Sequence, residues 1–330
     1  MVATVFIDGE SGTTGLQIRQ RLEGRRDIAL ASIGKDRRRD PAARAEIMND
    51  ADAVILCLPD DAAREAVGMI RNNRTRVIDA STAHRVAPNW VYGFPEMDNT
   101  QRDAIARAAR VTNPGCYATG AIALLRPLIG RKLVAADWPV TINAVSGYTG
   151  GGKQLVAAFE DPNSPDATRD NFRLYAMGVT QKHIAEIQAY SGLAHRPLFI
   201  PGVGRFAQGM LVSVPLQLWA MKGQPDLASL HAALAEHYAG ETFVEVVPLE
   251  ASLAIGRATS LDPRNPEPEA LNGTNRMRLF VFGNEEHRQA VLLAQLDNLG
   301  KGAAGQAVQN LNLMLGLDET TGLLEGMAPS

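Results

Sequence analysis

Residues 3–15 read Ala-Thr-Val-Phe-Ile-Asp-Gly-Glu-Ser-Gly-Thr-Thr-Gly, and this stretch decides the fold of the first part of the chain. An apolar run at 3–7 is typical of a buried strand, and residues 16–22 continue with apolar side chains at helical spacing. Glycines between a strand and a helix let the backbone approach a pyrophosphate, which binds at the helix N-terminus. The spacing Gly-x-x-Gly-x-x-Gly therefore favours a dinucleotide-binding turn over a plain tight turn. The predicted cofactor contacts here are Gly9, Ser11, Gly12, Thr13, Thr14 and Gly15.

Short apolar runs and amphipathic stretches alternate through the next residues. Strands are expected at 28–33, 53–58 and 76–79, and helices at 41–49 and 60–71. This alternation predicts a parallel sheet with helices on both faces.

The pattern changes after residue 116. A helix is expected at 117–129 and another at 302–315, with longer strand-like segments between them at 140–145, 209–218, 242–247, 276–282 and 290–296. We predict an α/β protein with two domains. One is a Rossmann-type parallel-sheet dinucleotide-binding domain from residues 1–115 and 301–330. The other is an α+β domain with a mixed sheet from residues 116–300.

Composition excludes several classes of protein. The formal net charge is −3 and aromatic residues make up 5% of the chain, so no nucleic-acid partner is expected. No apolar run approaches the roughly 18 residues of a membrane span, and no signal-peptide pattern opens the chain. We therefore expect a cytoplasmic protein without a membrane partner. No cluster of side chains has zinc-ligand spacing, so no metal is expected.

The end of the second predicted strand indicates which dinucleotide binds. An NAD-binding fold usually places an acidic residue there to bind the ribose. Here the strand runs into Lys35-Asp-Arg-Arg-Arg39, and four cations suit a 2′-phosphate better than a bare ribose. The sequence thus predicts NADP(H), while Asp36 and the possibility of a solvated basic loop keep NAD open. The contacts expected in this region are Ser32, Lys35, Arg37 and Arg38.

The two cysteines have different surroundings. Cys57 lies in an apolar segment, where a free cysteine usually acts as a small hydrophobe. Cys116 follows Asn-Pro-Gly and begins a predicted helix, whose positive end and free N–H groups favour the nucleophilic thiolate. By position alone, a buried cysteine without chemistry is an equal alternative for Cys116.

The segment 113–120, Asn-Pro-Gly-Cys-Tyr-Ala-Thr-Gly, resembles the nucleophile motif of the N-acetyl-gamma-glutamyl-phosphate reductases of arginine (ornithine) biosynthesis. Other blocks match the family in the same order, at 81–85, 92–96, 146–153 and 297–310, so the resemblance covers nearly the whole chain. The opening at 8–15 and the short length are similar to the second, shorter type of this reductase.

The resemblance implies an NADPH-dependent reduction of an acyl phosphate to a semialdehyde through a cysteine thioester. It assigns Cys116 as the nucleophile and His183 as the acid–base residue, with Glu186, one helical turn away, as the catalytic residue that orients His183. Arg85 is expected to bind the substrate phosphate or carboxylate, because a guanidinium can form bidentate hydrogen bonds with either group. Further expected contacts are His84, Asn113, Ser146, Gly147 and Arg205 for the substrate, and Gly302 and Ala303 for the cofactor.

One block departs from the family pattern, which reads roughly His-x-His-x-Pro-Glu. Residues 181–186 are Gln-Lys-His-Ile-Ala-Glu, so the first histidine is replaced by Gln181 and the proline by Ala185. His183 is left as the acid–base candidate of this block, and the role of the first histidine is in doubt.

Several alternatives remain at this point. Aspartate-semialdehyde dehydrogenase has the same fold and cysteine chemistry, and a reductase of aminoadipyl phosphate is closer still. A non-catalytic dinucleotide sensor would account for the altered histidine block. For each enzyme reading the partner is a small acyl phosphate, and the resemblance implies a homodimer or homotetramer formed by the middle domain.

Overall fold

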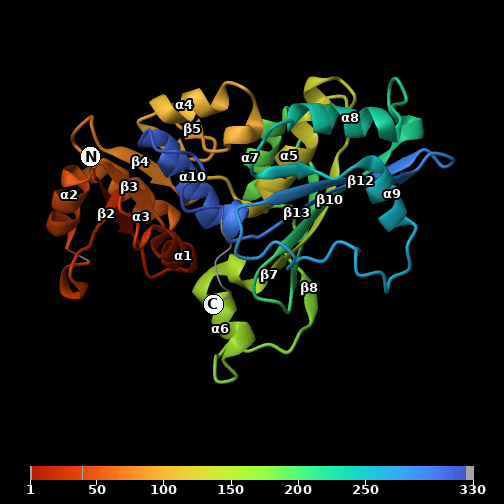
Figure 1. Cartoon of the computed structure of the whole chain (residues 1–330). Coiled ribbons are helices and arrows are strands. Elements are labelled where there is room, and N and C mark those ends of the chain that lie inside the picture. The colour runs from red at the N-terminus through yellow and green to blue at the C-terminus, as the bar shows by residue number, and fades with distance from the viewer. Residues whose placement is uncertain (1, 39, 325–330) are drawn as a thin grey trace. The chain divides into compact units, whose positions relative to one another are not determined.

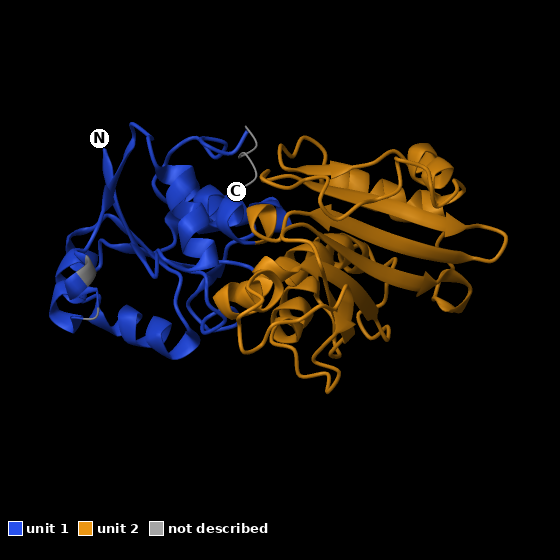
Figure 2. Ribbon diagram, turned by 90° about the horizontal axis from the view of Figure 1, so that it is seen from below, with its two compact units in different colours: residues 1–115, 303–328 blue, residues 116–302, 329–330 orange. Residues whose placement is uncertain are grey.

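The computed structural model describes residues 2–38 and 40–324, and Arg39 of the basic segment therefore lies outside the described residues. The chain divides into two compact units, which are treated separately (Figure 2). Unit 1 comprises residues 1–115 and 303–328, and unit 2 comprises residues 116–302 and 329–330. No helix in the described part of the chain is long and apolar enough to cross a membrane.

Unit 1 is built on a six-stranded sheet in the order β2-β1-β3-β4-β6-β5, and every strand pair in it is parallel (Figure 1). The strands are β1 (Ala3–Asp8), β2 (Ile28–Ala31), β3 (Ala53–Leu56), β4 (Arg76–Asp79), β5 (Val91–Tyr92) and β6 (Arg110–Thr112). All of β3 is buried, as expected of a parallel strand covered on both faces. The predicted Rossmann-type parallel sheet is confirmed.

Helices cover both faces of this sheet. They are α1 (Thr13–Leu22), α2 (Pro41–Asp50), α3 (Asp60–Met69), α4 (Gln101–Arg107) and α10 (Gly305–Met314). Helices α2 and α3 pack on one face around buried Met48, Ala63 and Val54, while α10 packs against α1, α4 and β4. The side chain of Asp40 caps α2 by accepting a hydrogen bond from the Ala42 amide, and Pro41 occupies the first turn.

Unit 2 contains a seven-stranded sheet in the order β11-β12-β13-β10-β7-β9-β8. Its strands are β7 (Thr141–Gly147), β8 (Phe172–Leu174), β9 (Leu198–Gly204), β10 (Met210–Gln217), β11 (Val244–Val246), β12 (Met277–Asn284) and β13 (Gln289–Leu296). Strand β7 pairs parallel with β9 and antiparallel with β10, so the predicted mixed sheet is confirmed.

The central helix of unit 2 is α5 (Cys116–Gly130), which packs on β10 and β13 and against α7 (His183–Ser191) and α8 (Leu227–His237). A Cβ atom at Gly120 would lie 2.9 Å from the Val212 side chain, so glycine allows the close packing of α5 on the sheet. The remaining helices are α6 (Gly152–Glu160) and α9 (Leu249–Gly256).

Several predicted boundaries were wrong by a few residues. The strand expected at 53–58 ends at Leu56, although the Cys57 amide still donates to the Asp8 carbonyl, and Pro59 soon prevents further pairing. The helix expected from residue 302 is α10 from Gly305, preceded by a π-helical turn, Gly300–Ala304.

Candidate active site

The glycine loop of unit 1 is shaped by close backbone contacts. Gly9 has φ +88°, and a Cβ there would lie 2.3 Å from the Cys57 carbonyl oxygen. A Cβ at Gly15 would lie 2.5 Å from the Gly9 carbonyl oxygen. Within the described residues no side chain caps α1 at Gly12, so its first N–H groups are available to an anion. These residues therefore fit a pyrophosphate.

Arginines gather beside this loop. Glu10 accepts hydrogen bonds from Arg38 and Arg19, each at 2.5 Å, whereas the ion pairs of Arg37 are long, at 3.8 Å with Asp40 and 3.9 Å with Glu46. Arg38 is thus held against the loop that carries Gly9 and Gly12, which suits a contact with a dinucleotide phosphate. Nothing is described for the side chain of Lys35.

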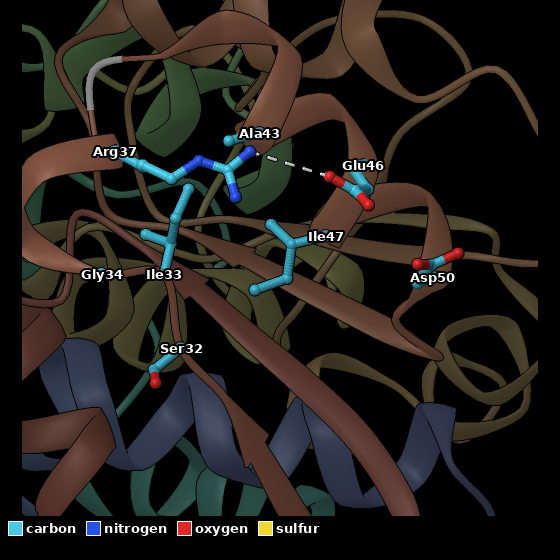
Figure 3. Close-up of a pocket in the computed structure, with 8 residues that line it drawn as sticks. All are labelled: Ser32, Ile33, Gly34, Arg37, Ala43, Glu46, Ile47 and Asp50. Carbon is cyan, nitrogen blue, oxygen red and sulfur yellow. Dashed lines mark ion pairs between the residues drawn. The ribbon is translucent and has the colours of Figure 1, made fainter.

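A pocket of about 280 Å³ follows β2 in unit 1. Figure 3 shows Arg37 extending toward Glu46 past the apolar side chains of Ile33 and Ile47. Ser32 lines the same pocket, which also contains acidic Asp50. The structure therefore places Ser32 and Arg37 at one pocket, while Arg38 pairs with Glu10 of the glycine loop.

The turn after β4 holds a buried polar cluster. Asp79 is fully buried and accepts hydrogen bonds from the amide and hydroxyl of Ser81, at 2.9 Å each. His84 Nδ1 lies 2.6 Å from the Asp79 carboxylate, and its ring stacks on Trp90 at 4.2 Å. Arg85 is also buried. The structure therefore fixes the His84–Arg85 dipeptide through Asp79, a residue to which the sequence assigned no role.

The side chain of Asn113 makes its hydrogen bonds within unit 1. Its side-chain amide donates to the Ala303 carbonyl at 2.9 Å, and its oxygen accepts from Asn310 at 3.0 Å. These bonds tie the segment before Cys116 to the π-helical turn that precedes α10 and to α10 itself. Both polar ends of the Asn113 side chain thus have a partner in the protein itself, and Ala303 contributes through its backbone.

Cys116 is the first residue of α5 in unit 2 and is partly exposed. A Cβ atom at Gly302 would lie 2.6 Å from the Cys116 Cβ, so the backbone at Gly302 runs directly against the cysteine. A helix N-terminus favours a thiolate, and the absence of a side chain at Gly302 keeps space beside Cys116.

Two tyrosines lie beside Cys116. The Tyr117 hydroxyl donates to the Gly202 carbonyl at 3.0 Å, and the Tyr175 hydroxyl donates to the Tyr117 oxygen at 3.2 Å. Burial raises the pKa of Tyr117, and the charges of Tyr175 and Cys116 add to that rise. Burial and the charge of Cys116 also raise the pKa of Tyr175, partly offset by hydrogen bonds to Tyr117 and Gln181. Both hydroxyls thus stay protonated near the nucleophile.

His183 begins α7, and Glu186 lies one turn later; both are buried. The rings of Tyr117 and His183 form a T-shaped pair, with centroids 5.4 Å apart and an interplanar angle of 77°. His183 Nδ1 lies 2.9 Å from Oε1 of Gln181, the residue that departs from the family pattern. The structure therefore brings Cys116, Tyr117 and His183 together in one unit.

The glycine-rich loop after β7 is partly structural. Ser146 is buried and its hydroxyl donates to the Gly147 carbonyl at 3.1 Å, while a Cβ at Gly147 would lie 2.4 Å from the Ala207 carbonyl oxygen. Arg205 donates to the carbonyls of Asp170, Thr168 and Phe159, at 3.0, 2.6 and 3.3 Å. These three bonds fasten the loop between α6 and β8.

Cys57 follows β3 of unit 1 and lies near two carboxylates. Burial raises the pKa of the Cys57 thiol to about 12, and the charges of Asp79 and Asp8 add to the rise. Such a thiol carries almost no thiolate near neutral pH, which agrees with the structural role predicted for it.

Sequence reasoning missed Tyr175 and Asp79. Tyr175 belongs to no recognisable motif, and only the fold brings it to Tyr117. Asp79 ends a predicted strand five residues before His84, and the carboxyl end of a parallel strand is a usual place for functional side chains. That position was the available signal for Asp79.

Two family models match the chain. The model for the NAD binding domain of semialdehyde dehydrogenases matches residues 4–108, and that for the semialdehyde dehydrogenase dimerisation domain matches residues 116–298.

Relatives agree with these matches. The N-acetyl-gamma-glutamyl-phosphate reductases of Brucella ovis and Brucella abortus are each 55% identical over 317 residues, covering 96% of this chain and 100% of theirs. Solved structures share the fold at low identity. A probable aspartate-semialdehyde dehydrogenase from Pseudomonas aeruginosa has a TM-score of 0.69 at 16% identity, covering 96% of this chain and 99% of that one. The aspartate semialdehyde dehydrogenase from Candida albicans, solved with NADP, has a TM-score of 0.63 at 13% identity, with the same coverage.

Proposed function

The chain belongs to the semialdehyde dehydrogenase family, and from this premise we propose that it reduces N-acetyl-L-glutamyl 5-phosphate to N-acetyl-L-glutamate 5-semialdehyde and phosphate. We base the chemistry on one observation, the place of Cys116 at the N-terminus of α5 beside Tyr117 and His183. The substrate follows from the relatives at 55% identity, since the fold alone also serves aspartate semialdehyde.

In this mechanism the Cys116 thiol gives its proton to His183 and the thiolate attacks the acyl carbon. A carbon–sulfur bond forms, the carbon–oxygen bond to phosphate breaks, and the departing phosphate takes the proton back from His183. The product is a thioester on Cys116. A bound reduced nicotinamide supplies the hydride that this thioester needs. Collapse of the carbon–sulfur bond then releases the aldehyde and the Cys116 thiolate, which regains a proton from solvent.

Arg85 is our candidate for binding the anionic end of the substrate. It is buried next to His84, which the Asp79 carboxylate orients. A buried guanidinium makes strong two-pronged contacts with phosphate or carboxylate. Arg205 is less suited, because its guanidinium already donates to three backbone carbonyls.

The glycine loop and the N-terminus of α1 would hold the pyrophosphate of a nicotinamide dinucleotide. We propose NADP(H) as the preferred form, with Arg38 as the nearest candidate for the 2′-phosphate, because Glu10 already holds it beside the loop. We also propose that unit 2 forms a homodimer or homotetramer, since its residues match a dimerisation domain. Light scattering on the purified protein would measure the assembly.

The test is the reverse reaction, followed by NADPH absorbance with N-acetyl-glutamate semialdehyde, NADP and phosphate. We expect turnover that requires phosphate, is unaffected by Cys57→Ser, and falls about 10³-fold or more in Cys116→Ser. Aspartate semialdehyde and NAD, run in parallel, test the substrate and cofactor assignments. Turnover that survives Cys116→Ser would refute the proposed nucleophile. Folded protein that binds NADPH but turns over no aldehyde would refute the enzyme and support a dinucleotide sensor.

A further inference from the structure

The side chain of Gln181 lies between the acid–base histidine and the tyrosines beside the nucleophile. It precedes α7 by two residues, and its oxygen accepts two hydrogen bonds from His183. One comes from the His183 backbone N–H at 2.6 Å and the other from the imidazole Nδ1 at 2.9 Å. The side chain that contacts His183 from position 181 is therefore an amide, whereas the family pattern has a second histidine at that position.

These two contacts determine the protonation of the imidazole ring. A backbone N–H can only donate, so the Gln181 atom that it contacts must be the carbonyl oxygen rather than the amide nitrogen. The same oxygen faces Nδ1, and an amide oxygen can only accept. Nδ1 must therefore carry a proton, which puts the lone pair of the neutral ring on Nε2.

The Gln181 side chain also lies near Tyr175 and acts to lower the pKa of that tyrosine. The Tyr175 hydroxyl in turn donates to the Tyr117 oxygen, and Tyr117 follows Cys116 on the first turn of α5. The two bonds that its oxygen accepts from His183 fix the orientation of the Gln181 amide relative to that histidine.

We propose that Gln181 is a positioning residue that holds His183 as the Nδ1–H tautomer, so that Nε2 takes the proton from the Cys116 thiol. This inference rests on the proposed function. The proton moves from Sγ to Nε2, giving a thiolate and an imidazolium. Because Nδ1 donates to Gln181 in both the neutral ring and the imidazolium, the ring keeps its orientation through the transfer. An amide also does not titrate, whereas a histidine at position 181 would compete for protons near neutral pH.

The titratable and charged groups around His183 come from a few elements. Helix α7 carries Glu186 and Tyr190, and α5, which packs against it, carries Cys116, Tyr117 and Arg126. Tyr175 approaches through Gln181, and exposed Lys182 precedes the helix. A substitution at Gln181 changes none of these groups chemically, so a shift in the titration of His183 that the Gln188→Met control lacks can be assigned to residue 181.

The experiment compares Gln181→Met, which removes the acceptor, with Gln181→Glu, which keeps an acceptor and adds a charge. Gln188→Met is the matched control, because Gln188 lies on α7 and bonds only the Ala194 carbonyl among the described hydrogen bonds. Nitrogen NMR of the histidine-labelled protein reads the tautomer and pKa of His183 directly. The rate of Cys116 alkylation, measured in a Cys57→Ser background, reports how readily Cys116 forms a thiolate and does not depend on catalytic turnover.

We expect the neutral wild-type ring to carry its proton on Nδ1 and the Gln181→Met ring to populate both tautomers. Alkylation of Cys116 and kcat should each fall roughly 10- to 100-fold in Gln181→Met, with KM within about threefold, and remain unchanged in Gln188→Met. In Gln181→Glu the carboxylate should raise the pKa of His183 by about one unit or more, with the same shift in the His183-dependent limb of the pH–kcat profile.

A wild-type ring protonated on Nε2, or wild-type alkylation by Gln181→Met, would overturn the inference. The two proposals fail differently. If the wild-type protein lacks turnover but has the Nδ1–H tautomer and a Cys116 whose alkylation slows in Gln181→Met, the proposed function is overturned and the role of Gln181 stands.

Discussion

Replacing Gly302 with alanine tests how closely the backbone of unit 2 confines the nucleophile. The new Cβ would lie 2.6 Å from the Cys116 Cβ and 3.2 Å from its Cα. Ordinary contacts begin near 3.4 Å, so the two atoms must separate by about 0.8 Å. Neither the backbone at Gly302 nor helix α5 can move easily. The Gly302 amide donates to the Asp297 carbonyl at 2.9 Å, and α5 is buried along most of its length.

The magnitude follows from this displacement. A misplacement of about 1 Å in a reacting group costs on the order of 10²-fold in rate, equivalent to about 2.7 kcal/mol of barrier. Forcing an extra methyl group into a packed site also lowers stability by about 1–3 kcal/mol. We therefore expect Gly302→Ala to fold, to melt at a lower temperature and to lose roughly 40-fold in kcat, because a displacement of about 0.8 Å would raise the barrier by about 2.2 kcal/mol.

The assay is the initial rate of the reverse reaction, with the alkylation rate of Cys116 and thermal melting measured on the same samples. Gly130→Ala is the matched control, because Gly130 ends the helix that Cys116 begins and a Cβ there meets nothing within 4 Å. That variant should keep its activity and gain up to about 1 kcal/mol in stability. The proposed steric confinement of Cys116 by Gly302 is wrong if Gly302→Ala keeps its kcat within threefold of wild type. It is also wrong if Gly130→Ala loses as much kcat as Gly302→Ala does.

Three further predictions concern groups outside the catalytic cluster. Because burial, with two neighbouring carboxylates, raises the pKa of Cys57 from 9.0 to about 12, its stabilising effect is complete below pH 9 and is lost as pH rises toward 12. Cys57→Ala should therefore melt with a shallower pH dependence above pH 9 than wild type, and equal slopes would contradict this. Arg205→Ala should speed proteolysis of the loop between α6 and β8 by several-fold while leaving KM for the acyl phosphate within about twofold; a large rise in KM would instead make Arg205 a substrate contact. Arg38→Ala should raise KM for NADP about tenfold or more and leave KM for NAD nearly unchanged, whereas an equal effect on both would exclude a 2′-phosphate contact.

Much of unit 1 follows from local pattern. The run at 3–7 and the glycines at 9, 12 and 15 predict β1 and its turn, because a parallel strand buried on both faces is apolar throughout and the turn needs close backbone approach. Two short strands on one side of the sheet could not be predicted in this way. Strand β5 has two residues and β6 has three, and both are defined by pairing with distant segments rather than by any period in the sequence.

In the candidate active site, too, some residues can be predicted from local sequence and others cannot. Cys116 at a helix start is readable from Asn-Pro-Gly and the apolar run that follows, because helix termini have local sequence signals. The partners of Cys116 have no such signal. Tyr175 lies 59 residues further along the chain, and only the packing of the unit brings its hydroxyl to Tyr117. Arg205 was an expected substrate contact, yet its guanidinium donates to three backbone carbonyls, which only the fold reveals.

The replacement of the family's first histidine by Gln181 has a physical explanation that the sequence alone does not give. Loss of an imidazole from an acid–base block suggests lost chemistry, as in a sensor. The structure shows that the side chain at 181 bonds both the backbone and the ring of His183 through one oxygen. Holding His183 in this way requires only an atom that always accepts hydrogen bonds. The oxygen of an uncharged amide is such an atom. The substitution therefore removes a titratable group and keeps the contact that orients the remaining one, so it favours an active acid–base residue over a degenerate site.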